Sequence, residues 1–552
     1  MKYITAGEFK YKKYVGRERN LKFIIEDKAA EKSDCIKLLY RDRKITYDQL
    51  NKRSNSLANS LLEIGEKKGS HIAVIFNNCP ELIYSWIAIS KIGAIWVPVN
   101  PVYKGHMLSH ILDHSDSTTL VTRYEYLEKL LPIKEELKNL KNVIVYPEIT
   151  KEDNVLLKLP FNFYSFNKLI EEGSPDNPDI EVLDKDIMAI SYTSGTTGDP
   201  KGCLQYQAQA YRFSQDVIPY KVKTGVLKHG DIMLNVLPLF HIGGIWVDFY
   251  TSITLDLPMA TTDFSASRFW KDVHDYKATY AWLLGTMGGI LLANPESPWE
   301  KNNTLRSCLY APYKPKEADN LRKRFGIKDI ATAYALSEGH CPFETVNPSK
   351  PTIGKNLLKY KRGVALIDED GMECPVGKPG EICLRSDPKN PWELFAGYFK
   401  NPEETVVTMR NFMLHTGDIA FKDEEGYYIF VDRVKHAIRR GGENISSERI
   451  EMSINKHPSV AECAVVAVPS EISEDEIKAY IFLKTGEKLE LKELVKFLDS
   501  ELPYFMVPRY YEFVDSMPKT ATEKIKKGEL RGKGLTGFET DIKEMGINLS
   551  KK

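Results

Sequence analysis

The sequence predicts an α/β protein, with a large N-terminal domain of layered, parallel-rich sheets and helices and a smaller C-terminal α+β domain. The 552 residues exceed the roughly 250–300 residues at which a single hydrophobic core stops growing. Short apolar runs rich in β-branched residues alternate with helical patterns, a rhythm typical of parallel sheets. We place the N-terminal domain at residues 1–432 and the C-terminal domain at residues 433–552.

The first βαβ unit is expected near residue 80. Residues 72–76 are expected to form a buried strand, residues 80–92 a helix and residues 94–97 the next strand. The apolar run from Leu82 to Val99 approaches membrane-spanning length, but Lys91 lies at its middle. We therefore expect a buried helix followed by a strand.

The remaining elements are expected further along the chain. The N-terminal strands are expected at 119–122, 142–146, 187–192 and 232–237, with a connecting surface stretch at 160–186. In the C-terminal domain we expect helices 446–456 and 490–500 and strands 461–468, 478–484 and 510–514. The Lys-rich tail after residue 524 is interpreted as ordinary surface or a fraying end.

Composition excludes several classes of function. Lys and Arg number 76 and Asp and Glu also number 76, so no overall basic field attracts nucleic acid or a membrane surface. We expect neither as a partner. The eight cysteines are scattered without a Cys-x-x-Cys pair, and the polar N-terminus lacks the apolar core of a signal peptide. Together these features predict a cytoplasmic protein with reduced thiols.

The strongest local signal is the segment Tyr192–Gly202 (YTSGTTGDPKG), directly after a predicted strand. Its glycines permit close backbone approach, its hydroxyls and N–H groups donate to phosphate oxygens, and Lys201 adds a cation. Lys does not directly follow Gly198, so the segment is no Walker loop. Composition alone leaves a Ser/Thr/Gly surface turn open as the alternative.

The order of residues in this loop resembles the signature of the adenylate-forming superfamily, which contains acyl-CoA synthetases, luciferase-like enzymes and peptide-synthetase adenylation domains. Five further segments resemble the motifs of that superfamily in the same order: 237–243, 334–338, 414–418, 432–445 and 518–524. The resemblance runs from Ile45 to about residue 530. Within it, residues 391–450 look most like crotonobetaine/carnitine:CoA ligase-like acyl-CoA synthetases.

The resemblance implies an ATP-dependent carboxylate:CoA ligase of the AMP-forming type. Such an enzyme activates a small or medium carboxylic acid as an acyl-adenylate and then transfers the acyl group to CoA, with ATP, Mg²⁺ and CoA as cofactor and co-substrates. A homodimer is compatible with it. Two alternatives stay open: an adenylating enzyme that loads a carrier protein in trans, and a catalytically silent acyl- or nucleotide-binding relative.

The resemblance also implies roles for individual residues. Glu338 would bind Mg²⁺, Lys435 would be the hinge of a mobile C-terminal domain, and Lys524 would be the catalytic lysine. The phosphates would be held by Thr193, Ser194, Gly195, Thr196, Thr197 and Lys201. The rest of the nucleotide would be bound by Tyr334, Ser337, Asp418, Arg433 and Lys524. The tunnel for CoA would include Gly441 and Gly442. The acyl pocket would include His241, Trp246 and Tyr310. The catalytic residues would be Lys524, Glu338, Thr193 and His241.

Three features depart from the family pattern or lie outside it. Glu523 stands where glycine normally precedes the catalytic lysine, and Tyr310 is a bulky residue that is expected to reshape the acyl pocket. His106, His110 and His114 recur at i, i+4 and i+8, which places three imidazoles on one helix face. Because no carboxylate or cysteine partner follows at suitable spacing, we interpret the histidines as a solvated face.

Overall fold

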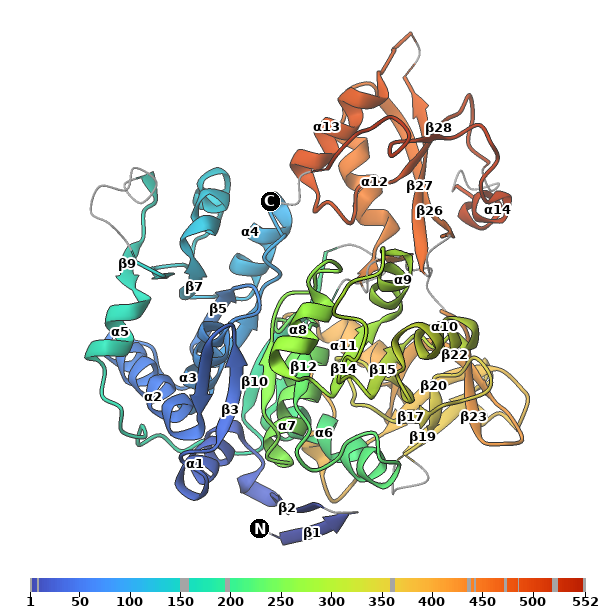
Figure 1. Cartoon of the computed structure of the whole chain (residues 1–552). Helices are drawn as coiled ribbons and strands as arrows, with labels where there is room; N and C mark the ends of the chain where they lie inside the picture. The colour runs from blue at the N-terminus through green and yellow to red at the C-terminus, as the bar shows by residue number, and fades with distance from the viewer. Residues whose placement is uncertain are drawn as a thin grey trace.

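The computed structural model shows a mixed α/β protein with a C-terminal part (orange to red) set above the rest of the chain (Figure 1). The structure describes residues 2–6, 9–148, 158–193, 199–357, 363–433, 438–440, 443–470, 474–484, 486–518 and 525–549. The layered, parallel-rich N-terminal architecture and the smaller C-terminal α+β part are as predicted. The domain boundary near residue 432 stays a prediction.

The first large sheet has eight strands in the order β21-β11-β10-β6-β5-β7-β8-β9. Its strands are β5 (His71–Ile75), β6 (Ile95–Pro98), β7 (Thr119–Arg123), β8 (Asn142–Tyr146), β9 (Asn162–Ser165), β10 (Ile187–Thr193), β11 (Lys201–Tyr206) and β21 (Gly397–Tyr398). The six strands from β10 to β9 run parallel, whereas β11 and β21 pair antiparallel. The stretch 160–186, expected as a surface connection, contains β9 and helix α5 (Phe166–Glu172).

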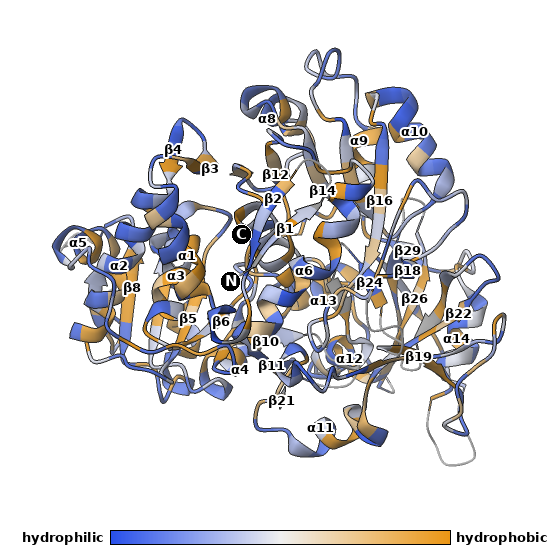
Figure 2. Ribbon diagram, turned by 90° about the horizontal axis from the view of Figure 1, so that it is seen from below, coloured by the Kyte–Doolittle hydropathy of each residue, from blue (hydrophilic) through white to orange (hydrophobic). Residues whose placement is uncertain are grey.

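Helix α3 (Pro80–Lys91) is buried on every side, which explains its lack of a polar face. The ammonium of Lys91 forms an ion pair with Glu26, Nζ to Oε1 2.8 Å, so its burial is compensated. The prediction of a buried helix followed by a strand is confirmed. Figure 2 shows the apolar residues gathered in such central elements, and within the described residues no helix is long and apolar enough to cross a bilayer.

The second sheet has thirteen strands in the order β19-β20-β22-β23-β18-β17-β16-β15-β14-β12-β13-β3-β4. Its first strands are β3 (Ile36–Tyr40), β4 (Arg43–Thr46), β12 (Met233–Asn235), β13 (Met259–Thr261), β14 (Tyr280–Leu284) and β15 (Ser307–Ala311). The others are β16 (Asp329–Tyr334), β17 (Phe343–Val346), β18 (Gly354–Asn356), β19 (Val364–Ile367), β20 (Gly380–Arg385), β22 (Met413–Lys422) and β23 (Tyr427–Arg433). Helix α6 (Gln207–Lys223) and the π-helix η4 (Gly243–Phe249) pack between the layers.

The C-terminal part contains a four-stranded sheet in the order β26-β27-β28-β29. Its elements are α12 (Ser447–Asn455), β26 (Val460–Pro469), β27 (Asp475–Leu483), α13 (Leu491–Glu501), β28 (Tyr510–Phe513), α14 (Lys527–Lys533) and β29 (Thr540–Asp541). The expected helices and strands are all present. Of the two alternatives for the tail, the described residues 525–549 do not show a fraying end, because β29 pairs with β28 and Asp541 forms an ion pair with Arg509 at 2.6 Å.

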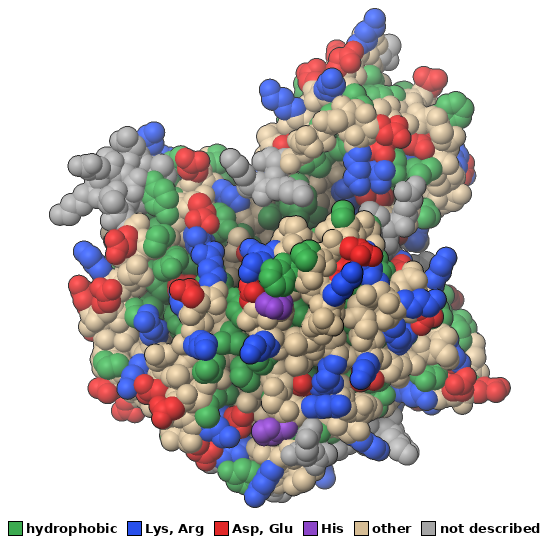
Figure 3. All heavy atoms as spheres, viewed as in Figure 1, with side chains coloured by type: hydrophobic (Ala, Val, Ile, Leu, Met, Phe, Trp, Pro, Cys, Tyr) green, Lys and Arg blue, Asp and Glu red, His purple; other side chains and the backbone are tan. Residues whose placement is uncertain are grey.

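Charged side chains of both signs intermingle over the face of the molecule seen in Figure 3, in keeping with the zero net charge. The surface is hollowed between the C-terminal part and the rest of the chain (Figure 3). The described residues of three motifs, 192–202, 334–338 and 414–418, lie on or next to strands of the two large sheets.

Candidate active site

The two strands that carry the predicted phosphate loop are β10 and β11. They pair antiparallel, with Thr193 opposite Lys201, so both ends of the loop are held at fixed positions. The Lys201 ammonium forms an ion pair with Glu404 of α11 (Pro402–Thr408), Nζ to Oε1 2.5 Å. It also lies 5.5 Å from the centroid of the Tyr398 ring. The lysine is thus held at the mouth of the loop by groups that the sequence did not identify.

The predicted adenine and ribose residues are brought together. Tyr334 ends β16, and its phenol donates to Oδ2 of Asp418 on β22 at 2.7 Å. Asp418 is buried and lies opposite Arg433 in the β22–β23 pair. One aromatic face and one carboxylate therefore share a site, as recognition of a nucleoside requires.

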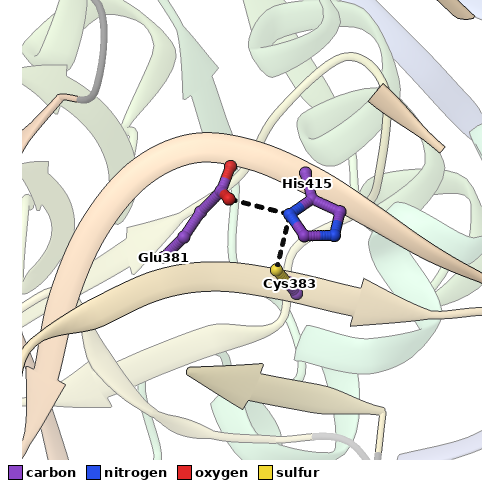
Figure 4. Close-up of side chains that lie close together, drawn as sticks. All are labelled: Glu381, Cys383 and His415. Carbon is purple, nitrogen blue, oxygen red and sulfur yellow. Dashed lines mark hydrogen bonds and ion pairs between the residues drawn. The ribbon is translucent and has the colours of Figure 1, made fainter. Parts of the chain in front are cut away.

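The part of β22 that carries Asp418 is held by Glu381 of β20. Its Oε1 accepts the backbone N–H of Gly417 at 2.9 Å, and its Oε2 lies 2.7 Å from Nδ1 of His415. Figure 4 shows Glu381 and the Cys383 thiol converging on this ring nitrogen, with Cys383 Sγ at 3.3 Å. Burial, reinforced by Glu381, raises the pKa of Cys383 to about 12, so the sulfur stays a neutral thiol.

Glu338, the predicted metal ligand, lies close to the phosphate-loop strands. Its Oε1 accepts a hydrogen bond from the Tyr398 phenol at 2.8 Å. Burial and this carboxylate raise the pKa of Tyr398, so the phenol remains a donor. A half-buried carboxylate beside a phosphate loop fits Mg²⁺, which binds through one or two carboxylates together with substrate phosphates.

The backbone of Ser337 is held by two glutamines, Gln205 of β11 and Gln209 of α6. The side-chain amide of Gln205 donates to the Ser337 carbonyl at 2.8 Å, and that of Gln209 donates to the same carbonyl at 3.0 Å. Gln209 also donates to the carbonyl of Gly339 at 2.8 Å. These glutamines set the backbone path of the adenine motif, and nothing in their sequence context indicated that role.

The three residues predicted for the acyl pocket lie at different depths. His241 is exposed at the start of η4, and its carbonyl accepts the N–H of Ile245 at 3.2 Å. Trp246 is fully buried within the same π-helix. Tyr310 is also fully buried, and its phenol donates to the Gly285 carbonyl at 3.3 Å and contacts Glu317. Their assignment to an acyl pocket stays a prediction.

Several predicted site residues lie outside the described part of the chain. They are Ser194, Gly195, Thr196, Thr197, Lys435, Gly441, Gly442 and Lys524. The side chain of Arg433 is also outside it, although its backbone belongs to β23. The roles of these residues stay predictions.

The histidines of α4 (Gly105–His114) contact the flanks of the phosphate loop, so the solvated-face interpretation was wrong for two of them. His114 Nδ1 lies 2.8 Å from the Tyr192 phenol oxygen, and His110 Nε2 lies 3.2 Å from the Pro200 carbonyl. Exposed His106 lies 3.2 Å from Asp199. The i, i+4, i+8 spacing predicted one shared face correctly, but it held no information on what that face would contact.

Comparison with known proteins agrees with this geometry. A model of the AMP-binding enzyme family matches residues 25–399, and a model of the AMP-binding enzyme C-terminal domain matches residues 449–524. The chain belongs to the AMP-binding enzyme family. The resemblance to adenylate-forming enzymes is thereby confirmed, and the protein is an enzyme of the adenylate-forming acyl-CoA ligase family.

The relatives span nearly the whole chain. Crotonobetaine/carnitine–CoA ligase of Salmonella typhimurium is 29% identical over 528 residues, covering 93% of this chain and 99% of the relative. Amide bond synthetase of Marinactinospora thermotolerans has a TM-score of 0.78 at 21% identity, covering 93% of this chain and 99% of its own. An o-succinylbenzoate CoA synthetase of Bacillus subtilis has a TM-score of 0.76 at 23% identity, covering 92% and 98%. These structural likenesses support the two-part fold.

Proposed function

We propose that the protein is an ATP-dependent carboxylate:CoA ligase of the AMP-forming type, acting on a small or medium carboxylic acid in the cytoplasm. The observation that carries the proposal is the hydrogen bond of Tyr334 to Asp418, close to the strands that hold the phosphate loop. The 29% identity to a CoA ligase over most of the chain supports CoA as the acceptor. All eight cysteines are free thiols, which suits a reducing compartment.

The first half-reaction joins two anions. A carboxylate oxygen of the acid attacks the α-phosphorus of ATP, the bond from that phosphorus to the bridging oxygen breaks, and pyrophosphate leaves. Tyr334 and Asp418 hold the adenosine while Lys201 offsets charge on the phosphates. Lys524, as the catalytic lysine, neutralises the oxygens around the α-phosphorus as a point charge.

Glu338 would hold Mg²⁺, and Thr193 ends the strand that leads into the phosphate loop. When bound, the ion neutralises the phosphates and orients them for displacement. Glu338 holds its carboxylate in place through the hydrogen bond from Tyr398, at 2.8 Å.

The second half-reaction replaces AMP by a thiol. The sulfur of CoA attacks the acyl carbon, the bond from that carbon to the AMP oxygen breaks, and the thiol proton passes to solvent. We propose that the C-terminal part turns about Lys435, withdraws Lys524 and presents Gly441 and Gly442 as the wall of the pantetheine tunnel. His241, exposed at the start of η4, separates the adenylate from this tunnel.

A pyrophosphate-release screen over a panel of carboxylic acids, with and without CoA, tests the proposal. We expect acid-dependent pyrophosphate release and, with CoA, a thioester. Thioester formation only with an added carrier protein would favour loading in trans. Absence of pyrophosphate release for every acid would favour a silent binding protein.

Lys524→Ala separates the two half-reactions. We expect it to abolish acid-dependent pyrophosphate exchange and still convert supplied acyl-adenylate plus CoA into thioester. Lys527→Ala is the matched control, because Lys527 forms an ion pair with Glu451 at 2.7 Å inside the C-terminal part. Equal loss of both half-reactions in Lys524→Ala would refute the domain rotation.

A further inference from the structure

Five ionisable side chains are buried in the interior of the large domain, where one hydrogen bond and electrostatic interactions link them. They come from β3, α6, η4, β14 and β17, and each is at most 1% exposed. We call this group the buried charge cluster, and its members are Lys37, Lys221, Asp248, Tyr280 and Glu344. Buried ionisable groups are rare unless paired, so the group requires an explanation.

The lysines of the cluster have partners inside the protein. Lys221 Nζ donates to the Tyr280 phenol at 3.1 Å. Lys37 Nζ donates to the hydroxyl of Ser252 and lies 4.7 Å from the centroid of the Phe249 ring. Each ammonium has three donor protons, so both retain further capacity to donate.

Three of the four carboxylate oxygens of the cluster lack such partners among the described residues. Within the part of the chain that the structure describes, both oxygens of Glu344 and Oδ1 of Asp248 make no hydrogen bond. Most buried polar side-chain atoms in proteins have at least one partner, and an unmet one costs roughly 1–3 kcal/mol. The cluster thus contains unused acceptors beside unused donors.

Other buried polar atoms on the described residues of η4, α7 and β14 also lack a partner. Among the described residues, the buried atoms Trp246 Nε1, Tyr250 Oη, Thr251 Oγ1 and Trp282 Nε1 make no hydrogen bond. The first three follow one another along η4 and α7 (Tyr250–Thr254). A π-helix is often found at functional sites, and buried polar atoms usually have a partner, so a polar ligand group is one way to satisfy these atoms.

The cluster lies on a sheet that also carries the adenine motif. Glu344 is the cross-strand partner of Ala333, the residue before Tyr334. Tyr280 and Leu284 lie on one face of β14, because side chains alternate along a strand, and Leu284 is the neighbour of Ala311 on β15. Small side chains, Ala311 and Ala333, therefore occupy this face of the sheet between the adenine motif and the cluster.

Charge decides what fits the cluster. The cluster contains two lysines and two acidic residues that attract one another electrostatically, and Lys37 is also attracted by Asp256. The protein therefore balances its own charge, and a ligand has to supply hydrogen bonds rather than charge. Since donors and acceptors are both unused, the matching group donates and accepts at once, as an alcohol hydroxyl does.

We propose that the buried charge cluster forms the far end of the acyl pocket and binds a hydroxyl group at the distal end of the carboxylic acid substrate. The proposal rests on the proposed ligase function and specifies its substrate class: hydroxy acids, in preference to plain fatty acids or acids with a quaternary ammonium group. A quaternary ammonium has no proton to donate and would add a charge to a balanced cluster.

Calorimetric binding without ATP tests this independently of catalysis. The ligands are straight-chain acids from hexanoate to dodecanoate, each paired with its ω-hydroxy and ω-trimethylammonium derivatives. We expect one ω-hydroxy acid to bind about tenfold or more tightly than its plain counterpart, because plain acids leave the buried polar atoms unmet. Equal or tighter binding of the plain or the trimethylammonium acid, or no binding of any acid, would overturn the proposal.

The double variant Lys221→Met/Glu344→Leu removes one charge of each sign and is expected to abolish the preference for the hydroxy acid. The matched control is Glu26→Leu/Lys91→Met, which removes a buried ion pair on α3 and should retain the preference. If the cluster double variant does not fold, Asp248→Asn replaces it and should reduce the preference. An unchanged preference in the cluster variant would overturn the proposal.

Pyrophosphate exchange with the same acids separates this proposal from the ligase function. Selective binding of a hydroxy acid without exchange for any acid would refute the ligase function and leave the pocket assignment supported. Exchange that is indifferent to the hydroxyl, together with indifferent binding, would refute the pocket assignment alone.

Discussion

Arg449 of α12 forms an ion pair with Asp199, with Nη1 3.0 Å from Oδ1. Asp199 is the first described residue after residues 194–198 of the phosphate loop. Arg449 is buried while Asp199 is about one-third exposed, and His106 and His110 of α4 approach the same carboxylate. The C-terminal part is therefore attached, in this orientation, to the segment that is predicted to hold the phosphates of ATP.

Arg449→Met is expected to slow one half-reaction by about three- to tenfold and leave the other unchanged, since one part-exposed ion pair contributes about 1 kcal/mol. The reason is that the pair can stabilise only one of two domain orientations. Pyrophosphate exchange and thioester formation from supplied acyl-adenylate measure the two steps separately. Lys456→Met, which breaks the ion pair with Glu501 inside the C-terminal part, is the control, and equal slowing of both steps by Arg449→Met would contradict the idea.

Tyr334→Phe tests the contact between the adenine and ribose residues. The variant keeps the aromatic ring and removes only the hydroxyl that donates to Asp418 at 2.7 Å. We expect the KM for ATP to rise about three- to tenfold with little change in kcat, because a net hydrogen bond contributes about 1 kcal/mol and both states of the reaction lose it equally. An unchanged KM for ATP would show that this hydrogen bond does not shape the nucleotide site.

Glu381→Gln tests whether Asp418 is positioned from behind. The amide keeps one acceptor for the Gly417 N–H but loses the charge that faces His415 and Arg410. We expect a higher KM for ATP and an unchanged KM for the acid. Arg410→Met is the control, because it removes the exposed partner of Glu381 and leaves the Gly417 contact in place. A parallel rise in both KM values would indicate general loss of structure instead.

Much of the fold followed from local sequence patterns. Helix α3 and strand β6 were predictable because an apolar run with a central lysine and an interrupting proline is compatible with few structures other than a buried helix and strand. The structure adds the partner of that lysine, Glu26. The sequence left the tail undecided between ordinary surface and a fraying end, because its structure depends on Arg509, a residue more than thirty positions earlier that pairs with Asp541. Short local windows hold no information on such partners.

The candidate site likewise contains residues that the sequence identified and residues that it did not. Tyr334 and Asp418 were identified because motif order places them, and the structure brings them within hydrogen-bond distance. Glu381 and Gln209 were missed because each acts through a backbone N–H or carbonyl, and such contacts leave no recognisable spacing in the sequence. The contacts of the α4 histidines depended likewise on a tertiary neighbour, the phosphate loop.

His340 gives a prediction about acid stability. It is buried 3.4 Å from Asp216, and burial lowers its pKa to about 4, below its ordinary 6.5. Between these two pKa values the imidazole is protonated in the unfolded state and neutral in the folded state, so acid favours unfolding. The free energy of unfolding is therefore unaffected by His340 above about pH 6.5 and decreases as the pH falls to about 4. Over this pH range we expect the free energy of unfolding, measured with urea, to decrease by up to about 3 kcal/mol less in His340→Gln than in the unmodified protein. His274→Gln replaces an exposed histidine and is the control, which should leave the pH dependence of unfolding intact. Identical acid sensitivity of His340→Gln and the unmodified protein would exclude His340 as the source of this pH dependence.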